Sequence, residues 1–339
     1  MITVGFTYDL RDDYIAQGFS AEDSAEFDSQ ETIESIEASL KANGYAVERI
    51  GNVKALAEAL VLGRRWDIVF NICEGVKGIG REAQVPALLE AYGIPLVFSP
   101  SDLMVVTMNK ALAKLIVREY GVPTAPFAII DEVGKAGEVD LPYPLFAKPL
   151  AEGTGKGITG KSIIQHPGEL AGICAGLIET FNQPALVETY LPGRDLTVGI
   201  LGTGRNARAV AVMETTFKEG AEAGSQSFYN KEHCERVLEY SLLTGDTAEA
   251  AAEIAIRSWN ALGCCDAGRV DLRCDAQGVP HFLEVNPIAG LHPTHSDLPI
   301  LATMVGMSHI DLIGEIMSHA LGRYGLVPLQ LEAQAGTRK

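Results

Sequence analysis

Residues 268–287 read GRVDLRCDAQGVPHFLEVNP, and this stretch predicts a β-hairpin with one charged face. Arg269 and Asp271 are two residues apart, so they share one face of a strand, as Glu284 and Asn286 do on its partner. A tight hairpin brings the four side chains together. Three of them carry the oxygen ligands that hold magnesium between carboxylates and nucleotide phosphates. A solvated polar face with a surface ion pair is the alternative interpretation of the same spacing.

Upstream of this hairpin, the first hundred residues alternate between strand and helix patterns. Amphipathic stretches predict helices over 30–43, 53–62 and 82–92. The apolar runs that predict strands are ITVGFTY, YAVERI, DIVFNI and IPLVFS. Parallel strands joined by helices form a doubly wound sheet, so residues 1–100 are predicted to be an N-terminal α/β domain.

The next part of the chain, residues 101–187, predicts a central α+β domain. A helix is expected from Ser101 or Asp102 to Gly121, and another begins at Pro167. The expected strands are FAII, PLFAKPL, SII and ALVETY. Because these runs are too close together for helical crossovers, we expect antiparallel pairing.

The remaining part of the chain predicts a second α+β domain over residues 188–328. Two hairpins are expected, TVGILG with ARAVAVME and GRVDLRC with PHFLEVN, together with a helix over 247–262. Residues 329–339 are predicted to be a tail. The fold class is therefore α/β, with an N-terminal parallel sheet followed by two α+β domains.

The segment GKGITGKS, residues 155–162, matches the P-loop pattern letter for letter, but its context argues against a P-loop. A P-loop requires a helix immediately after the motif, whereas here Ile163 and Ile164 follow and the next helix begins only at Pro167. We interpret the segment as part of a glycine loop between two strands. Such a loop can place backbone N–H groups over phosphates, although a mobile surface hairpin is the alternative.

The composition limits the classes of function. The chain has 339 residues, of which 47% are hydrophobic, enough for a buried core, and its net charge is −17. That charge disfavours general binding to nucleic acids or to anionic membranes, so any anionic ligand must meet local cations. Lys148 is one such cation; it points either to solvent or to a phosphate. No apolar stretch reaches about 18 residues, and no signal peptide is apparent, which predicts a cytoplasmic protein.

The six cysteines contain no CxxC pair. They are therefore expected to be free thiols rather than a disulfide framework or a structural zinc site.

Five motifs, taken in chain order, resemble the D-alanine–D-alanine ligase branch of the ATP-grasp superfamily. They are Lys110 in MNKALAK, Lys148 in FAKP, the glycine loop, Glu188 in VETYLPGRDL, and RVD with FLEVN. Each motif is weak alone, but the order and separations make the combination specific. The resemblance spans nearly the whole chain and implies a three-domain ATP-grasp fold in which two α+β domains clamp ATP.

The resemblance also implies roles on the nucleotide side. Lys110 and Lys148 match the lysines at the ATP phosphates, Glu188 and Leu191 match adenine contacts, and the glycine loop contributes Gly153, Thr154 and Gly155. Asp195 matches the residue at the ribose hydroxyls, where the family usually carries Glu, so a shorter acid must reach further. Lys231 ends the segment over 214–231 that matches the family's closing loop, and is expected at the γ-phosphate. Loop closure excludes water from an acyl phosphate.

The family uses two magnesium ions, for which manganese can substitute. Asp271, Glu284 and Asn286 match the metal ligands. Arg269 matches the arginine that steadies the tetrahedral intermediate, a role that suits its place beside the carboxylates.

The departures from the family pattern lie on the substrate side. The family's LHG after the third strand reads CEG here, so Glu74 replaces a histidine and favours a more cationic substrate. Glu26 or Asp28 is the candidate for the acid that holds the ammonium group of the first substrate.

The family's loop for the second substrate also differs. It reads PIAGLHPTHSD, which keeps Gly290 and Ser296 and adds His292 and His295. The HxxH spacing permits a metal site, but no third ligand is nearby in sequence, so we interpret both histidines as substrate-loop or packing residues.

Together these features predict an ATP-dependent, ADP-forming carboxylate–amine ligase. ATP phosphorylates a carboxylate, and an amine captures the acyl phosphate. The expected partners are small molecules, amino acids or a dipeptide, and a homodimer is the expected assembly. Synthesis of the D-alanine dipeptide itself stays open. So do an ATP-binding regulatory or scaffold protein without turnover, an ATP-grasp kinase, and a ligase that uses a hydroxy-acid nucleophile.

Overall fold

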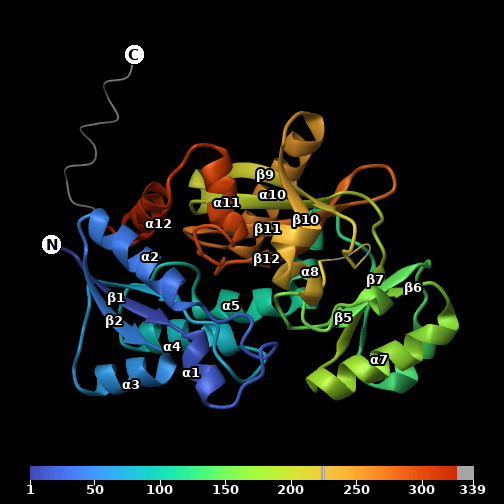
Figure 1. The fold of residues 1–339 in the computed structure, drawn as a ribbon, viewed down its shortest axis with the longest axis horizontal. Coiled ribbons are helices and arrows are strands. Elements are labelled where there is room, and N and C mark those ends of the chain that lie inside the picture. Colours follow the sequence, from blue (N-terminus) through green and yellow to red (C-terminus); the bar gives the residue numbers. More distant parts are fainter. Residues whose placement is uncertain (223, 225, 327–339) are drawn as a thin grey trace.

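A computed structural model of the chain describes residues 1–222, 224 and 226–326, so the predicted tail over 329–339 lies outside it. Three sheets follow one another along the chain. In Figure 1 the N-terminal sheet (blue) and a four-stranded sheet (green) lie at opposite ends of the molecule, and a five-stranded sheet joins them. The predicted three-part α/β architecture is confirmed.

The N-terminal sheet is parallel and doubly wound, as predicted. Its strands are β1 (Thr3–Tyr8), β2 (Ala46–Gly51) and β3 (Ile68–Ile72), in the order β2-β1-β3. Helices α2 (Gln30–Ala42) and α12 (His309–Arg323) pack on one face, and α3 (Val53–Val61) and α4 (Gln84–Ala91) pack on the other. The sequence interpretation missed α12 and the short helix α1 (Arg11–Ala16).

The fourth strand predicted at IPLVFS is wrong, because only Leu96 forms an isolated bridge, with Val69. Phe98 has a positive φ of 74°, which ends the extended conformation, and its N–H donates to an Asp266 carboxylate oxygen at 2.9 Å. Arg323 of α12 donates to the carbonyl oxygens of Leu96 and Phe98, both at 2.9 Å. Side chains thus satisfy the backbone groups that a longer strand would have paired.

This junction predicts a large stability effect. Asp266 is fully buried, and its Oδ2 lies 2.6 Å from Arg323 Nη2. We expect Arg323→Met to lower the free energy of unfolding by about 3 kcal/mol, because it leaves a buried carboxylate without its cation. Urea unfolding monitored by tryptophan fluorescence measures the change. The control is Arg208→Met, which removes an exposed pair with Glu315 on the same helix and should cost under about 1 kcal/mol. Equal losses in the two variants would contradict the prediction.

The four-stranded sheet is antiparallel, which confirms the expected pairing. Its strands are β4 (Phe127–Ile130), β5 (Leu145–Pro149), β6 (Ile163–Ile164) and β7 (Ala185–Thr189), in the order β4-β7-β5-β6. Helix α7 (Pro167–Phe181) packs on it through Leu170 and Cys174. Because β6, not a helix, follows the glycine loop, the segment is not a P-loop. The predicted domain boundary at 187–188 falls within β7, and the domain limits stay a prediction.

The single helix predicted from Ser101 to Gly121 is wrong, because the structure has two helices here. These are α5 (Ser101–Met108) and α6 (Lys110–Glu119). Asn109 between them has a ψ of 95°, outside the helical region, and its side chain accepts the N–H of Leu112 at 3.1 Å. The break places Lys110 at the first turn of a new helix.

The five-stranded sheet is antiparallel and has the order β10-β9-β8-β11-β12. Its strands are β8 (Asp195–Leu201), β9 (Arg208–Phe217), β10 (Leu238–Leu243), β11 (Ala267–Cys274) and β12 (Pro280–Asn286). Both predicted hairpins are confirmed, and so is the helix expected over 247–262, which is α10 (Asp246–Leu262). The sequence interpretation missed β10 and helix α11 (Asp297–Met304).

The closing loop expected over 214–231 is partly regular structure. It begins inside β9 and ends inside α8 (Phe228–Glu232), which α9 (Cys234–Val237) follows. The short 3-10 helices elsewhere are η1 (Arg81–Ala83), η2 (Val133–Glu138), η3 (Gly160–Ser162) and η4 (Gly204–Asn206).

All six cysteines are free thiols, as predicted. Within the described ranges, no single helix has the length and apolar character needed to cross a membrane. Helices α11 and α12 reach that length and apolar character only as a pair, and the angle between them is 111°.

Candidate functional site

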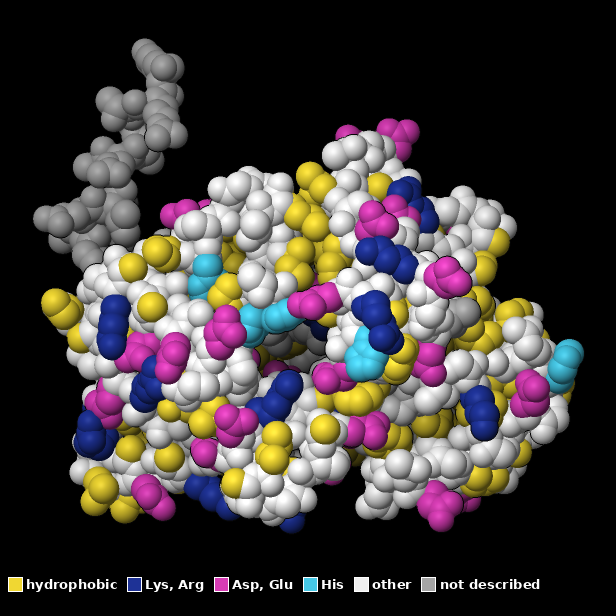
Figure 2. All heavy atoms as spheres, viewed as in Figure 1, with side chains coloured by type: hydrophobic (Ala, Val, Ile, Leu, Met, Phe, Trp, Pro, Cys, Tyr) yellow, Lys and Arg dark blue, Asp and Glu magenta, His cyan; other side chains and the backbone are white. Residues whose placement is uncertain are grey.

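Two adjoining cavities contain the predicted site residues. The larger has a volume of about 820 Å³ and lies where the three parts of the chain meet, and the smaller, of about 90 Å³, lies between the four- and five-stranded sheets. Figure 2 shows a hollow near the centre of the molecule with histidine side chains at its edge. Lys110, Gly153, Lys231 and Glu284 line both cavities, so the two form one continuous site.

Every residue predicted for the site lines one cavity or both. The larger cavity also has Glu26, Asp28, Glu74, Thr154, Arg269, Asn286, Gly290, His292 and Ser296. The smaller also has Lys148, Gly155, Glu188, Leu191, Asp195 and Asp271.

The β11–β12 hairpin brings its four polar side chains together, as predicted. The register places Arg269 opposite Asn286 and Asp271 opposite Glu284. Arg269 Nη1 lies 2.5 Å from Asp271 Oδ2, and the Asn286 amide donates to the same oxygen at 3.2 Å. Asp297 is a second anion beside Arg269, at 3.2 Å. The guanidinium is therefore held in place between two carboxylates.

The two carboxylates of the hairpin have opposite pKa shifts. Burial alone would raise the pKa of Glu284, but Lys110, at 3.3 Å, and Lys148 outweigh it and hold this pKa well below its usual value. Burial raises the pKa of Asp271 to about 6, and the charge of Glu284 adds to the effect. The lysines therefore favour the ionised form of Glu284, and additional positive charge at the hairpin would favour the ionised form of Asp271.

The lysine that was expected to point either to solvent or to a phosphate is buried. Lys148 is 5% exposed, and its Nζ lies 3.0 Å from Glu188 Oε1. The other oxygen of Glu188 lies 2.9 Å from Lys114, which is fully buried. Although burial opposes ionisation, the two lysines lower the pKa of Glu188 to about 2. Lys114 was missed; the signal was its position one helical turn after Lys110.

The glycine loop closes over the smaller cavity. Gly155 has a φ of 72°, and a Cβ there would lie 2.7 Å from the carbonyl oxygen of Gln226 and 2.8 Å from the N of Phe228. Only glycine permits both the left-handed conformation and this close approach. The loop therefore packs directly against the start of α8, which carries Lys231.

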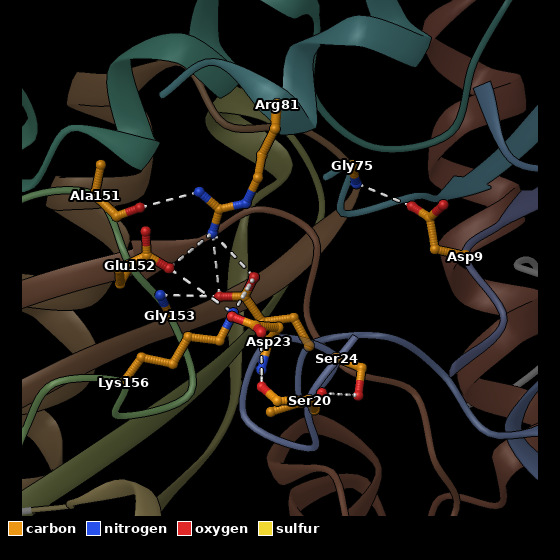
Figure 3. A network of polar contacts seen from close by, with 12 residues as sticks. Asp9, Ser20, Asp23, Ser24, Gly75, Arg81, Ala151, Glu152, Gly153 and Lys156 are labelled. Carbon is orange, nitrogen blue, oxygen red and sulfur yellow. Dashed lines mark hydrogen bonds and ion pairs between the residues drawn. The ribbon is translucent and has the colours of Figure 1, made fainter. Parts of the chain in front are cut away.

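Glu26 connects the N-terminal part of the chain to the glycine loop. Its carboxylate lies 2.9 Å from Arg81 Nη2 and 3.2 Å from Lys156 Nζ, and it accepts the N–H of Gly153 at 2.9 Å. In Figure 3, Arg81 also reaches the carbonyl oxygen of Ala151. The charge of Glu26 is thus compensated by protein cations, and the sequence interpretation missed both of them.

Three carboxyl groups of the larger cavity that lie near Glu26 have no ion pair among the residues that the structure describes: Asp28, Glu74 and Glu82. Burial raises the pKa of Asp28 to about 7. Burial and the charge of Glu82 raise the pKa of Glu74 well above its usual value. Burial also raises the pKa of Glu82 to about 7, and the charge of Glu26 adds to this shift. Glu82 was missed, although it follows the CEG motif on the same segment. A cationic group placed among these carboxyls would favour their ionised forms.

The loop after β12 forms the rim of the larger cavity. The N–H of His292 donates to Ser296 Oγ at 3.0 Å, and the rings of His292 and His295 lie 4.6 Å apart. His292 Nε2 lies 3.7 Å from Glu31, and His295 Nδ1 lies 3.5 Å from Glu235. Nowhere in the described part of the chain do three or more His, Cys, Asp or Glu side chains form a cluster suited to a metal ion, so the HxxH metal alternative has no support.

Asp195 lies at the far end of the smaller cavity. Gln226 Nε2 donates to its Oδ1 at 2.8 Å, and Arg273 Nη1 lies 3.4 Å from its Oδ2. The sequence interpretation missed Gln226 and Arg273. For Arg273 a signal existed, because it follows Asp271 by two residues and so lies on the same strand face.

Comparisons with known proteins point to one family of ligases. The D-ala D-ala ligase C-terminus family model matches residues 116–318. Over 252 residues the chain is 32% identical to the D-alanine–D-alanine ligase of Bordetella avium, covering 71% of this chain and 74% of that protein. Over 294 residues it is 31% identical to that of Xylella fastidiosa, covering 83% and 90%. The structure of the Bacillus anthracis D-alanine–D-alanine ligase complexed with ATP is similar in fold, with a TM-score of 0.71 at 20% identity over 96% of this chain and 99% of that one.

Proposed function

Because the chain belongs to the D-alanine–D-alanine ligase family, we propose that it is an ATP-dependent ligase that joins a carboxylate to an amine through an acyl phosphate. One observation carries the proposal. The two carboxylates of the β11–β12 hairpin and Arg269 lie together beside buried lysines, where the two cavities meet. Phosphoryl transfer depends on positioning and charge stabilisation more than on covalent help from the protein, and this arrangement supplies both.

In this proposal the base and ribose of ATP occupy the smaller cavity and the phosphates point into the larger one. Lys110 and Lys231 line both cavities and Lys148 lines the smaller one, and these lysines meet the phosphates. A cavity of about 90 Å³ is too small for a nucleotide, so the glycine loop and the start of α8 must separate before ATP enters. Their return over the bound nucleotide excludes water from the acyl phosphate.

The proposed magnesium ligands are Asp271, Glu284 and Asn286. Their donor atoms are carboxylate and amide oxygens, which suit a hard cation, and the strand register holds the two carboxylates opposite each other. Magnesium held there would supply positive charge that offsets the negative charge of the phosphate groups.

The proposed chemistry has two steps. A carboxylate oxygen of the first substrate attacks the γ-phosphorus, and the bond from that phosphorus to ADP breaks. The nitrogen of the second substrate then attacks the acyl carbon, the amide bond forms, and phosphate leaves while the nitrogen loses a proton. Arg269 stabilises the oxyanion of the tetrahedral intermediate from its fixed position between Asp271 and Asp297.

We further propose that one substrate carries a cationic group besides the reacting groups and the α-ammonium of the first substrate. Glu74 and Glu82 lie in the larger cavity without a protein cation in ion-pairing distance among the described residues, in contrast to Glu26. A D-alanine pair offers one non-reacting cation, the α-ammonium of the first alanine, and no second one for Glu74 and Glu82, so the proposal favours a diamino acid, a diamine or a basic peptide.

The test of the proposed function is ATP- and magnesium-dependent phosphate release against single and paired D- and L-amino acids, diamines and hydroxy acids, with mass spectrometry of the products. An amide product establishes the ligase, and the D-alanine dipeptide as the main product would overturn the cationic-substrate proposal alone. An ester product supports the hydroxy-acid alternative. ATP binding without release for any pair supports the scaffold alternative.

Glu74 is expected to select the cationic substrate. Glu74→His should lower kcat/KM for a cationic substrate roughly tenfold, because it removes a half-buried carboxylate partner, and should leave the KM for ATP unchanged. Steady-state kinetics with a cationic substrate and its uncharged analogue measure the change. The control is Glu48→His, an acid paired with Arg64 outside both cavities. An unchanged substrate profile in Glu74→His would place this residue outside the recognition surface.

A further inference from the structure

Arg273 lies in the wall of the smaller cavity, and its guanidinium N–H groups contact two other residues of that cavity. Arg273, on β11, is 8% exposed, and its Nη1 lies 3.4 Å from Asp195 Oδ2. Its Nη2 donates to the hydroxyl of Tyr190 at 3.3 Å, and the guanidinium carbon lies 5.2 Å from the centre of the Tyr190 ring. Its Nε is buried without a hydrogen-bond partner among the described residues. Arg273 therefore fixes the acid and the aromatic ring relative to each other.

The acid needs such a cation. Asp195 is 7% exposed, and burial raises the pKa of its carboxyl group while Arg273 opposes that shift. The amide of Gln226 also binds this carboxylate, but it brings a neutral hydrogen bond only. A carboxylate accepts hydrogen bonds from two hydroxyl groups, whereas its protonated form offers fewer acceptor sites. Hydrogen bonds that involve an ionised group are also the stronger ones.

The ring of Tyr190 forms a second part of the cavity wall. Tyr190 stacks on Phe146 at a centroid distance of 6.3 Å and an interplanar angle of 24°, and both line the cavity. A flat, apolar wall beside a hydroxyl-binding acid is the surface that a nucleoside requires, with the base against the rings and the sugar at the carboxylate. Arg273 lies where these two subsites join.

We propose that Arg273 is a positioning residue for the nucleotide sugar, which holds the Asp195 carboxyl group aligned so that the enzyme distinguishes ribose from deoxyribose. The inference rests on the proposed function, since it takes ATP as the ligand of the smaller cavity. Because Arg273 acts through Asp195, its loss should remove sugar discrimination rather than base or phosphate binding.

The test measures equilibrium dissociation constants by calorimetry for ATP, 2′-deoxy-ATP and 3′-deoxy-ATP in the presence of magnesium. The wild-type protein should bind ATP roughly tenfold more tightly than at least one deoxy analogue, the effect of one hydrogen bond to a charged acceptor. Arg273→Met should reduce that ratio to within about twofold, and Asp195→Asn should do the same. The control Arg194→Met removes an exposed Arg–Glu pair on the same sheet and should keep the full ratio.

The outcomes separate this inference from the proposed function. If Arg273→Met weakens all three nucleotides equally and keeps the ratio, its role is structural and the inference is overturned. If Arg273→Met does not fold, Arg273→Lys decides. An ammonium group cannot reach Asp195 and Tyr190 together, so the ratio should fall at least about threefold. Wild-type protein that binds ATP without discrimination overturns the inference alone. Wild-type protein that binds none of the nucleotides overturns both.

Discussion

Glu284→Gln is expected to lower kcat by at least about 10³-fold while the fold stays intact. The side chain lines both cavities, lies 3.3 Å from Lys110 and stands opposite Asp271 across the hairpin. The amide keeps the shape of the side chain but removes the negative charge that the surrounding cations stabilise. The variant is then expected to lose both the proposed metal binding and the alignment of the phosphates. A decrease in kcat of this order is typical when a group that stabilises charge in the transition state is removed. Phosphate release under saturating ATP and substrate measures it.

The control for this change is Glu37→Gln. Glu37 also pairs with two cations, Lys41 and Arg49, and its side chain is 16% exposed compared with 21% for Glu284, but it lies on α2 outside both cavities. Thermal melting should show similar, small effects in the two variants, and only Glu284→Gln should lose turnover. Full activity in Glu284→Gln would remove the β11–β12 hairpin from the assigned site.

The hairpin was predictable because strand geometry has a simple period. Alternate residues share one face, so the spacing of Arg269, Asp271, Glu284 and Asn286 determines that they meet once the turn is located. The same rule places Arg273 on the face of Asp271, and this arginine was missed because the motif ends before it. The strand period thus predicted the four residues of the motif, but not Arg273, which lies just beyond it.

Contacts between distant parts of the chain were not predictable in this way. Glu26 is separated from Arg81 and from Lys156 by many residues, and no spacing rule relates them. The same holds for the pair of Asp266 and Arg323, which shortens the expected strand at IPLVFS. These contacts depend on how the three sheets pack, and sequence patterns determine the sheets but not their packing.

The charge distribution reconciles an acidic protein with an anionic ligand. The net charge of −17 repels anions from the surface as a whole, and the composition therefore required local cations. The structure places Lys110, Lys148 and Lys231 in the cavity walls. Lys148 is held there by a buried acid, Glu188, which keeps a positive charge in a place where burial alone would remove it.

Lys148→Met is expected to abolish measurable turnover, whereas Lys114→Met should keep kcat within about tenfold of the wild type. Both lysines pair with Glu188, at 3.0 and 2.9 Å, so each variant loses one ion pair with the same buried carboxylate. Of these two lysines, only Lys148 lines the smaller cavity; Lys114 Nζ is turned toward Thr124 Oγ1 and the carbonyl oxygen of Phe282. Comparing the two variants distinguishes the role proposed for Lys148, which is to bind the phosphates, from that of Lys114, which is to stabilise the fold.

The measurements for this pair are kcat, the KM for ATP and the unfolding midpoint in urea. We expect Lys114→Met to lose more stability, since it leaves Thr124 Oγ1 and one oxygen of Glu188 without a donor and removes one of the two donors to the carbonyl oxygen of Phe282. Lys148→Met should lose the chemistry at a smaller cost to the fold, because water in the cavity can solvate Glu188 from that side. Suppose instead that both variants lost turnover to the same extent, and that each loss matched the loss in unfolding free energy. Lys148 would then be a structural residue. The proposed position of the phosphates would move away from it, toward Lys110 and Lys231.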